Sequence, residues 1–360
     1  VTSGNTQKLS VGIVSAYQFY GDGSNLTGAG FSPDSQENLY AGTSAGAASD
    51  SDTCFNIGIG ACALKSVNEG DNNIALGTNV GCSITSANGN ILLGSSTGTS
   101  LSTGFANIIA GYQAGQSYES SYGVILGYRA AKNMTSSSGT IAIGFETIMG
   151  DGSTAPSGNH NTAIGYRAGK CLQCGLNNTF IGAYVGCKAT TGENNVAAGY
   201  QALSAGSVTG DYNVVFGSGA GYEMSSADGN IVLGMYAGCK LTGNCNIAIG
   251  NRSGGGGTTS ASGARNISIG EKAGCRISSG TQNVFIGRDA ASSQEVTGSE
   301  NIAIGRNAGQ CLTSGCYNIF LGRYAAGLQC FTGSDNIAMG RRAMFCPSGS
   351  NNIIMGTAAG

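Results

Sequence analysis

Tryptophan is absent from this sequence of 360 residues, histidine occurs once, proline occurs three times, and only 10% of the residues are charged. The scarcity of proline and the lack of a Gly-X-Y period exclude collagen in spite of 63 glycines. A hydrophobic share of 41% with so little charge also argues against a disordered chain. Many glycines and few charges are instead typical of short strands joined by tight turns.

Two further absences concern partners. The sequence has no run of about twenty apolar residues, the length that spans a membrane, so we expect no membrane insertion. The net charge is −2, so we expect no nucleic acid as a partner. The charge is nevertheless uneven. Residues 251–360 carry nine Lys/Arg against five Asp/Glu, or +4, whereas residues 1–250 carry eight against fourteen, or −6.

An internal repeat predicts the fold. Blocks of the form Asn-Ile-x-Ile-Gly recur, and sixteen of the eighteen spacings between their glycines are 16, 17 or 18 residues. This glycine defines position 0 of each repeat. The nineteen glycines are Gly42, Gly60, Gly77, Gly94, Gly111, Gly127, Gly144, Gly165, Gly182, Gly199, Gly217, Gly234, Gly250, Gly270, Gly287, Gly305, Gly322, Gly340 and Gly356. Such a period indicates one short unit stacked many times.

The other positions of the repeat have predicted roles. Position −4 is Asn in seventeen of nineteen repeats, which predicts a ladder of side-chain amides along the stack. Positions −3 and −1 are almost wholly aliphatic, so we expect both to point into the coil. The small residues at +3 and +4 fit a narrow corner. We predict an all-β protein, a parallel β-solenoid (β-roll) of about nineteen 17-residue coils with two short strands each, over residues 31–360, after a connector at residues 1–30.

Position −2 should then point outward, yet it is polar in only one repeat, at Ser268. An apolar stripe along the whole stack is too large to leave in water. We therefore expect this position to face neighbouring copies in a homo-oligomer, with Phe180, Phe285 and Phe320 as inter-chain packing residues. The alternative is that the N-terminal segment of the same chain covers the stripe.

Two segments resemble known fibre proteins. The block at residues 301–309, Asn-Ile-Ala-Ile-Gly-x-x-Ala-Gly, resembles the head repeats of YadA-like trimeric adhesins, which are trimers of left-handed parallel β-rolls. Residues 19–28, Phe-Tyr-Gly-Asp-Gly-Ser-Asn-Leu-Thr-Gly, resemble a shaft motif in tail fibres of marine, T4-like cyanophages, where similar Asn-Ile-x-Ile-Gly arrays occur. The resemblance implies a homotrimer.

The resemblance further implies a structural component of a virion tail fibre, extracellular on the virion surface, that attaches to host surface glycans. The period of 17 is longer than the repeat of the adhesins, and the adhesin anchor and stalk are not found. A cellular trimeric adhesin is the alternative, and a tailspike-like depolymerase is a further one. Since the repeats run to residue 360, we also expect end-on contact with other fibre or virion subunits.

Positions +1 and +2 carry an aromatic and basic stripe. Rings and guanidinium groups can bind anionic glycans by stacking and charge-assisted hydrogen bonds. The alternative is that these side chains cover backbone and make contacts between chains. The residues expected to face a glycan are Tyr128, Arg129, Tyr166, Arg167, Arg306, Arg323 and Tyr324.

The thirteen cysteines allow two interpretations. Cys239 and Cys245 flank a Thr-containing turn, and Cys311 and Cys316 flank an equivalent one, which predicts two local disulfides in an oxidising compartment. The alternative is reduced cysteine that serves as a small hydrophobic residue. With His160 as the only histidine and no repeated acidic position, we expect no catalytic residue, cofactor or metal site.

Overall fold

The structure, a computed structural model, describes residues 33–150, 152, 154–255, 260–327, 330–345 and 349–360. The chain divides after residue 32, and the second unit, residues 33–360, contains the repeats. The connector predicted at residues 1–30, with its shaft motif, lies outside the described residues.

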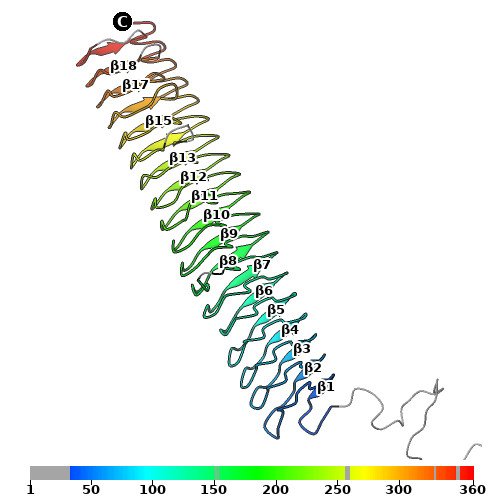
Figure 1. Cartoon of the computed structure of the whole chain (residues 1–360). Helices are drawn as coiled ribbons and strands as arrows, with labels where there is room; N and C mark the ends of the chain where they lie inside the picture. Colours follow the sequence, from blue (N-terminus) through cyan, green and yellow to red (C-terminus); the bar gives the residue numbers. More distant parts are fainter. Residues whose placement is uncertain (1–32, 151, 153, 256–259, 328–329, 346–348) are drawn as a thin grey trace, which may run out of the picture. The chain divides into compact units, whose positions relative to one another are not determined.

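The second unit is a parallel β-solenoid, as the repeat predicts. Nineteen strands of three residues, each at positions −3 to −1, pair in parallel with the next strand in chain order (Figure 1). No helix occurs in the part of the chain that the structure describes. The strands are β1 (Leu39–Ala41), β2 (Ile57–Ile59), β3 (Ile74–Leu76), β4 (Ile91–Leu93), β5 (Ile108–Ala110), β6 (Val124–Leu126), β7 (Ile141–Ile143), β8 (Thr162–Ile164), β9 (Thr179–Ile181), β10 (Val196–Ala198), β11 (Val214–Phe216), β12 (Ile231–Leu233), β13 (Ile247–Ile249), β14 (Ile267–Ile269), β15 (Val284–Ile286), β16 (Ile302–Ile304), β17 (Ile319–Leu321), β18 (Ile337–Met339) and β19 (Ile353–Met355).

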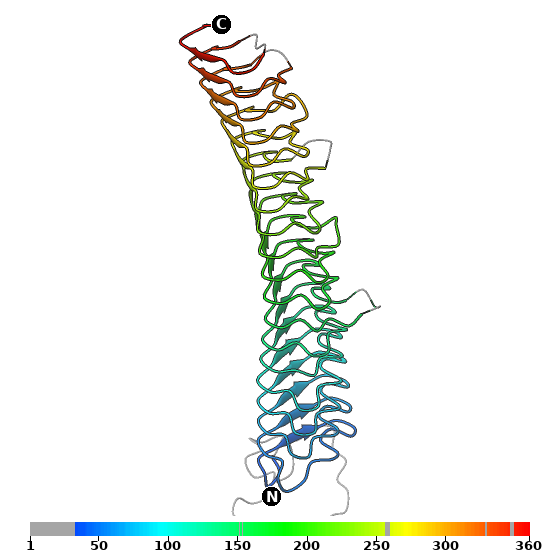
Figure 2. The ribbon, with the colours of Figure 1, turned by 90° about the vertical axis from the view of Figure 1, so that its left-hand side faces the viewer.

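Each coil has one strand, where two were predicted. The second strand is reduced to isolated parallel bridges in a few coils, such as Ala189 with Val208 and Leu312 with Phe331. Elsewhere the described coils turn continuously, so the strands lie in a single sheet along one side of the stack (Figure 2). Hydrogen bonds between turns of successive coils, such as Tyr324 N–H to the Arg306 carbonyl at 3.0 Å, hold the rest of each coil in register.

The glycine at position 0 is required by the backbone. Gly305 has a φ of +133°, in the region that side chains other than glycine rarely adopt. A Cβ atom there would lie 2.7 Å from the carbonyl oxygen of Gly322 in the next coil. The backbone therefore turns and approaches the next coil at the same point, which explains why this position is invariant along the array.

The asparagine ladder at position −4 is confirmed. The Oδ1 atom of Asn301 accepts hydrogen bonds from the backbone N–H and the Nδ2 of Asn318, at 3.0 and 2.9 Å. Its own Nδ2 donates to Asn283 Oδ1 at 3.0 Å and to the Gly315 carbonyl at 2.8 Å. Asn301 is fully buried, so these bonds satisfy polar groups that water does not reach.

The ladder is interrupted at Gly123, where a tyrosine replaces the missing amide. In a regular coil the Asn side chain donates to the carbonyl fourteen residues later, as Asn90 does to Gly104. Fourteen residues after Gly123 is Ser137, whose carbonyl accepts a hydrogen bond of 3.0 Å from the Tyr118 hydroxyl. A Cβ atom at residue 123 would lie 2.7 Å from that hydroxyl, so glycine makes room for it. Burial raises the pKa of Tyr118, which keeps the donor protonated.

The prediction of which strand positions face the interior was wrong. The middle residue of the strand, at −2, is buried in seventeen strands and half-buried only in the end strands β1 and β19, at Tyr40 and Ile354. Positions −3 and −1 are half-buried or exposed. Since side chains alternate along a strand, a strand of three residues can place either its middle residue or its two flanking residues in the interior, but not all three.

The size of the interior explains the choice. The side chain at −2 packs against position +4 on the far side of a narrow coil. A Cβ atom on Gly186 would lie 3.0 Å from the ring of Phe180, and one on Gly98 would lie 3.3 Å from the side chain of Leu92. The interior therefore holds the side chain at −2, mostly small residues at +3 and +4, and an apolar side chain at +7, such as Leu101 or Leu312. The alanines at +3 are buried, as predicted, except for the half-buried Ala45 and Ala359 in the two end coils.

Candidate functional site

The residues predicted to pack between chains are part of the core of the single chain. Phe180, Phe285 and Phe320 are at most 1% exposed without any partner. The ring of Phe320 meets that of Phe331 edge-on at a centroid distance of 5.3 Å, within the same chain. These three residues therefore stabilise the coil and do not form a surface, which corrects the prediction.

The apolar surface lies instead on the opposite face of the same strands. We define the outer face as positions −3 and −1 of β1–β19. Thr162 and Thr179 are its only polar residues. Ile181 is 45% exposed and Phe216 is 42% exposed. Sequence reasoning missed this face because it placed the uniform aliphatic positions inside.

The +1 and +2 positions form an edge next to the outer face, and its first part is a continuous aromatic ladder. Ring centroids of Tyr112, Tyr128, Phe145 and Tyr166 lie 5.6, 5.1 and 5.1 Å apart in succession, with interplanar angles of 18°, 8° and 5°. Tyr166 is followed by two edge-to-face contacts, to Tyr184 and on to Tyr200, at 5.1 and 6.3 Å. We define the aromatic ladder by these rings, Tyr112, Tyr128, Phe145, Tyr166, Tyr184 and Tyr200.

The aromatic ladder has few free ring faces. The parallel stacking places one ring against the next, and the Arg129 and Arg167 guanidinium carbons lie 5.1 Å from the centroids of Tyr128 and Tyr166. A sugar binds an aromatic side chain through the ring face, which is occupied here. The structure thus places Tyr128, Arg129, Tyr166 and Arg167 together, as predicted, in an arrangement that favours contacts within the stack.

A cluster missed by sequence reasoning fixes one end of this group. Glu146 Oε2 accepts hydrogen bonds from Arg167 Nε at 2.9 Å and from Lys170 Nζ at 3.1 Å. Burial alone would raise the pKa of Glu146, but the hydrogen bonds and charges of Lys170 and Arg167 outweigh it, so the pKa lies below the ordinary carboxyl value. The single carboxylate balances one of the two positive charges, and it occupies the Nε donor of Arg167, which leaves fewer Arg167 donors for an anionic ligand.

The last part of the edge is basic. We define the arginine ladder as Arg288, Arg306, Arg323 and Arg341, which occupy position +1 in the coils of β15–β18. All four are exposed. Arg342, at +2, adds a fifth exposed guanidinium. The predicted residues Arg306, Arg323 and Tyr324 are thus close together, but they lie many coils away from Tyr128 and Tyr166.

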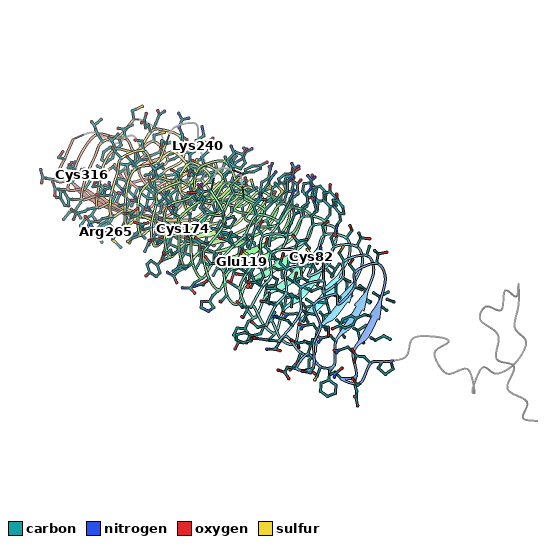
Figure 3. All side chains as sticks on the ribbon, turned by 60° about the horizontal axis from the view of Figure 1, so that its bottom comes forward. Cys82, Glu119, Cys174, Lys240, Arg265 and Cys316 are labelled. Atoms are coloured by element: carbon teal, nitrogen blue, oxygen red, sulfur yellow. The ribbon has the colours of Figure 1, made fainter. Side chains whose placement is uncertain are left out.

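The predicted disulfides are not formed. Cys239 and Cys245, and likewise Cys311 and Cys316, are unbonded because the two members of each pair occupy different corners of the coil, near +5 or +6 and near −6 or −5. Figure 3 labels Cys82, Cys174 and Cys316, which belong to coils well separated along the stack.

The cysteines near +5 have a local structural role. The thiols of Cys187 and Cys275 donate to the carbonyls of Ser204 and Ser292 in the next coil, at 3.4 and 3.5 Å. Burial raises the pKa of Cys187, Cys239, Cys275 and Cys311, so the thiol remains the protonated donor. This agrees with the interpretation of reduced, small side chains in corners.

His160 is exposed, and its side chain lies against Gly139 of the preceding coil. Within the described ranges, no three His, Cys, Asp or Glu side chains group so that they could hold a metal ion. Nor do these ranges contain a helix of the length and hydrophobicity that crossing a membrane requires. Comparison with known proteins finds no matching family model, no similar curated protein and no similar solved structure.

Proposed function

We propose that this protein is the repeat-built rod of an extracellular fibre, and that copies of the chain assemble through the outer face. One observation carries the proposal. The outer face is apolar along all strands except at Thr162 and Thr179, and yet it is partly exposed to solvent in the single chain. An exposed apolar surface of this extent is typical of an interface and not of a solvated sheet.

The size of the outer face supports a stable interface. With strands about 4.8 Å apart, nineteen strands span about 86 Å. Three residues with their side chains cover a width of about 10 Å, which gives about 860 Å² per chain. One partner in a standard protein interface contributes about 800 Å².

A second copy of the same chain is the partner that fits this face best. Side chains on the outer face repeat once per strand, and another copy repeats with the same rise. A second copy can therefore bury the face along the full length of the stack. Since the outer face carries no charged residue, an interface between two such faces buries no unpaired charge. We propose a parallel homotrimer, in line with the resemblance to trimeric fibres.

The resemblance to cyanophage fibres supports a virion tail fibre, and a cellular trimeric adhesin is the alternative. Imaging of the intact particle or cell with a labelled antibody separates these two. In either case the protein serves as an elongated structural element at a surface. We further propose that it makes end-on contact with other subunits and attaches to surface glycans. Nothing in this role requires a catalytic group.

The experiment that tests assembly is a pair of substitutions on the outer face. Ile249→Asp with Ile269→Asp places two carboxylates on adjacent strands, where they repel each other and would be buried in the interface. We expect multi-angle light scattering to give the mass of a trimer for the native protein and that of a monomer for the variant, with an unchanged circular dichroism spectrum.

Met235→Asp with Asn251→Asp is the matched control, because both residues are exposed turn residues at +1 in adjacent coils. The control should remain assembled. A native protein that is monomeric at micromolar concentration would contradict the proposal and would favour coverage of the outer face by residues 1–32 of the same chain.

A further inference from the structure

We propose that the arginine ladder, with Arg342, is a binding site for a linear anionic polysaccharide, one that carries a carboxylate, sulfate or phosphate on its sugar rings. The inference rests on the proposed function in one respect, namely that the fibre acts at a glycan-covered surface. It goes further by naming the residues and the chemical class of the ligand. It also moves the site away from Tyr128 and Tyr166.

The backbone sets the spacing of the arginine ladder. The carbonyl of Arg288 accepts a hydrogen bond of 2.9 Å from the N–H of Asn307, that of Arg306 one of 3.0 Å from Tyr324, and that of Arg323 one of 2.9 Å from Arg342. Each arginine is thus tied to the coil that follows it. The result is a row of arginines whose backbones lie about 4.8 Å apart, the rise between strands.

Most of these charges lack a protein counter-ion. Among the described residues the ion pairs are Glu146 with Arg167 and Lys170, and Arg288 with Asp289. Arg306, Arg323, Arg341 and Arg342 therefore form no ion pair there. Like charges in adjacent coils repel, and such a row is stable only because water and salt screen it. An anion that lies along the row would relieve the repulsion.

Two of the guanidinium groups are already oriented. The Arg323 guanidinium carbon lies 5.2 Å from the centroid of Tyr324, and that of Arg342 lies 5.2 Å from the centroid of Phe345. A guanidinium held over a ring still presents its N–H edge outward. This edge matches the two oxygens of a carboxylate or sulfate in a bidentate contact.

The two parts of the edge differ in whether their side chains are available to a ligand. Those of the first part are engaged within the chain, and those of the second part are mostly free. Beside the aromatic ladder, Arg167 is paired with Glu146 and the ring faces are covered by neighbouring rings. In the arginine ladder the cations are exposed, and all but Arg288 are unpaired within the described residues. Arg129 beside the aromatic ladder also lacks an ion pair there, but the arginine ladder repeats unpaired cations in successive coils, so an anionic polymer gains most of its new contacts at the second part.

The charge spacing favours a polysaccharide over nucleic acid. Duplex DNA carries one negative charge per about 1.7 Å of its axis, roughly three times the density of the ladder, so most phosphates would find no partner. A polysaccharide with one charged group on each sugar ring has a charge spacing much closer to the rise of one coil.

The test measures binding of the full chain to immobilised polymers by biolayer interferometry. The probes are dextran sulfate, polygalacturonate, neutral dextran and duplex DNA, at low and at raised salt. Dextran sulfate and polygalacturonate should bind, and neutral dextran should not. In the variant Arg306→Gln, Arg323→Gln, Arg341→Gln we expect an affinity about 100-fold lower, since one exposed charged contact contributes about fivefold.

The control variant removes the same charge elsewhere, through Arg129→Gln, Lys188→Gln and Arg252→Gln, and should bind like the native protein. Light scattering must show both variants assembled like the native protein, so that loss of binding and loss of assembly are measured separately. Equal weakening in both variants, or no binding by the native protein to either anionic polymer, would overturn the proposal. Tighter binding of duplex DNA than of dextran sulfate would assign the ladder to nucleic acid instead.

Discussion

The two faces of each strand are both apolar, but they differ in how residue size varies along the stack. The inner residues at −2 range from Gly58 to Phe180, whereas the outer residues at −3 and −1 are mostly Ile, Leu and Val. Inside, the aromatic residues lie beside small ones, since Phe180 lies between Ala163 and Ala197 in the adjacent strands. Outside, bulky residues follow one another in most strands, as Ile247, Ile267 and Val284 do at −3.

The difference teaches that hydrophobicity alone does not identify the interior of a narrow coil. A closed interior has a fixed volume, so its residues must vary in size together. An outer face has no such constraint until a partner covers it. The comparison leads to matched pairs of substitutions in which one residue lies inside and its counterpart lies outside or retains its partners.

The largest effect is expected from neighbouring residues of β17. Phe320→Ala leaves a cavity in the coil, which costs about 3–5 kcal/mol, whereas Ile319→Ala on the outer face costs under about 1 kcal/mol in the single chain. Both are made in the dissociated Ile249→Asp, Ile269→Asp background, so that assembly does not contribute. Hydrogen exchange of the coils around β17 measures the local free energy of opening.

Similar losses for both substitutions would mean that the strand is buried on both faces within one chain. A larger loss for Ile319→Ala would place −3 and −1 in the interior after all. Because each coil contacts only its neighbours, the opening caused by Phe320→Ala should be confined to the coils near β17.

At position −6 a side chain also accepts a hydrogen bond from the preceding coil, as Ser299 Oγ does from the Thr281 N–H at 3.0 Å. The second comparison is between this more exposed contact and the buried asparagine ladder at −4. Asn301→Ala leaves the backbone N–H of Asn318 and the carbonyl of Gly315 without partners in the interior, and should cost about 2–4 kcal/mol. Ser299→Ala removes the acceptor of the Thr281 N–H in a place that water reaches, and should cost under about 1 kcal/mol. Urea denaturation of both variants measures the difference, and equal losses would contradict it.

Much of this fold could be predicted from the sequence, because each regular feature repeats. The glycine at 0 recurs in every coil and the asparagine at −4 in almost every coil, and the asparagine forms the predicted ladder. Even the exceptions have local explanations, as at Gly123, where Tyr118 supplies the donor. The single strand per coil was not predicted, because a turn-forming segment and a short strand have the same composition here.

The orientation of the strands could also have been predicted from covariation inside the repeat. The residues larger than alanine at +4 are Leu64, Ile148, Leu203 and Met344, and they follow by six residues Gly58, Ala142, Ala197 and Ala338. Every large residue at +4 thus pairs with Gly or Ala at −2, which indicates that the two positions share one interior. The ion pairs of Glu146 could not be predicted in this way, since they occur in only one pair of coils.

The third comparison concerns acid pairs in the two parts of the edge. The pKa of Glu146 lies below its ordinary value of 4.5 in the folded chain. The stabilisation by this carboxylate is therefore complete above the ordinary value and is lost as the pH falls through the lowered folded value. We expect the thermal midpoint to fall over this range, and Glu146→Gln to lower it at neutral pH and to weaken its dependence on acid.

Asp289 is the control, because its pair with Arg288 at 3.2 Å is more exposed, with 51% of the arginine side chain in solvent. Such pairs contribute little. Asp289→Asn should therefore leave both the midpoint and its pH profile nearly unchanged. An equal effect of the two substitutions would show that the Glu146 cluster is no better shielded than an ordinary surface pair.

The smallest effect is expected at Ser268, the one polar residue of the inner face. Its Oγ is buried without a hydrogen-bond partner in the described structure. It also lies between the two clusters of the buried core, one ending at Ala261 and the other beginning at Ile277. Ser268→Ala keeps the Cβ and removes an unsatisfied hydroxyl, so it should stabilise the chain by about 1 kcal/mol.

Ser253→Ala is the matched control, because Ser253 is equally buried but its Oγ donates to the Gly250 carbonyl at 3.0 Å. This substitution should destabilise the chain by about 1 kcal/mol. Thermal unfolding of the two variants should therefore shift in opposite directions. A loss of stability in both would mean that the Ser268 hydroxyl has a partner such as a buried water, and that the inner face tolerates a polar residue by hydrating it. A gain in stability at Ser268 alone would show that a polar group is unfavourable on the inner face because this face packs within the chain. The outer face differs because it has no such packing in the single chain.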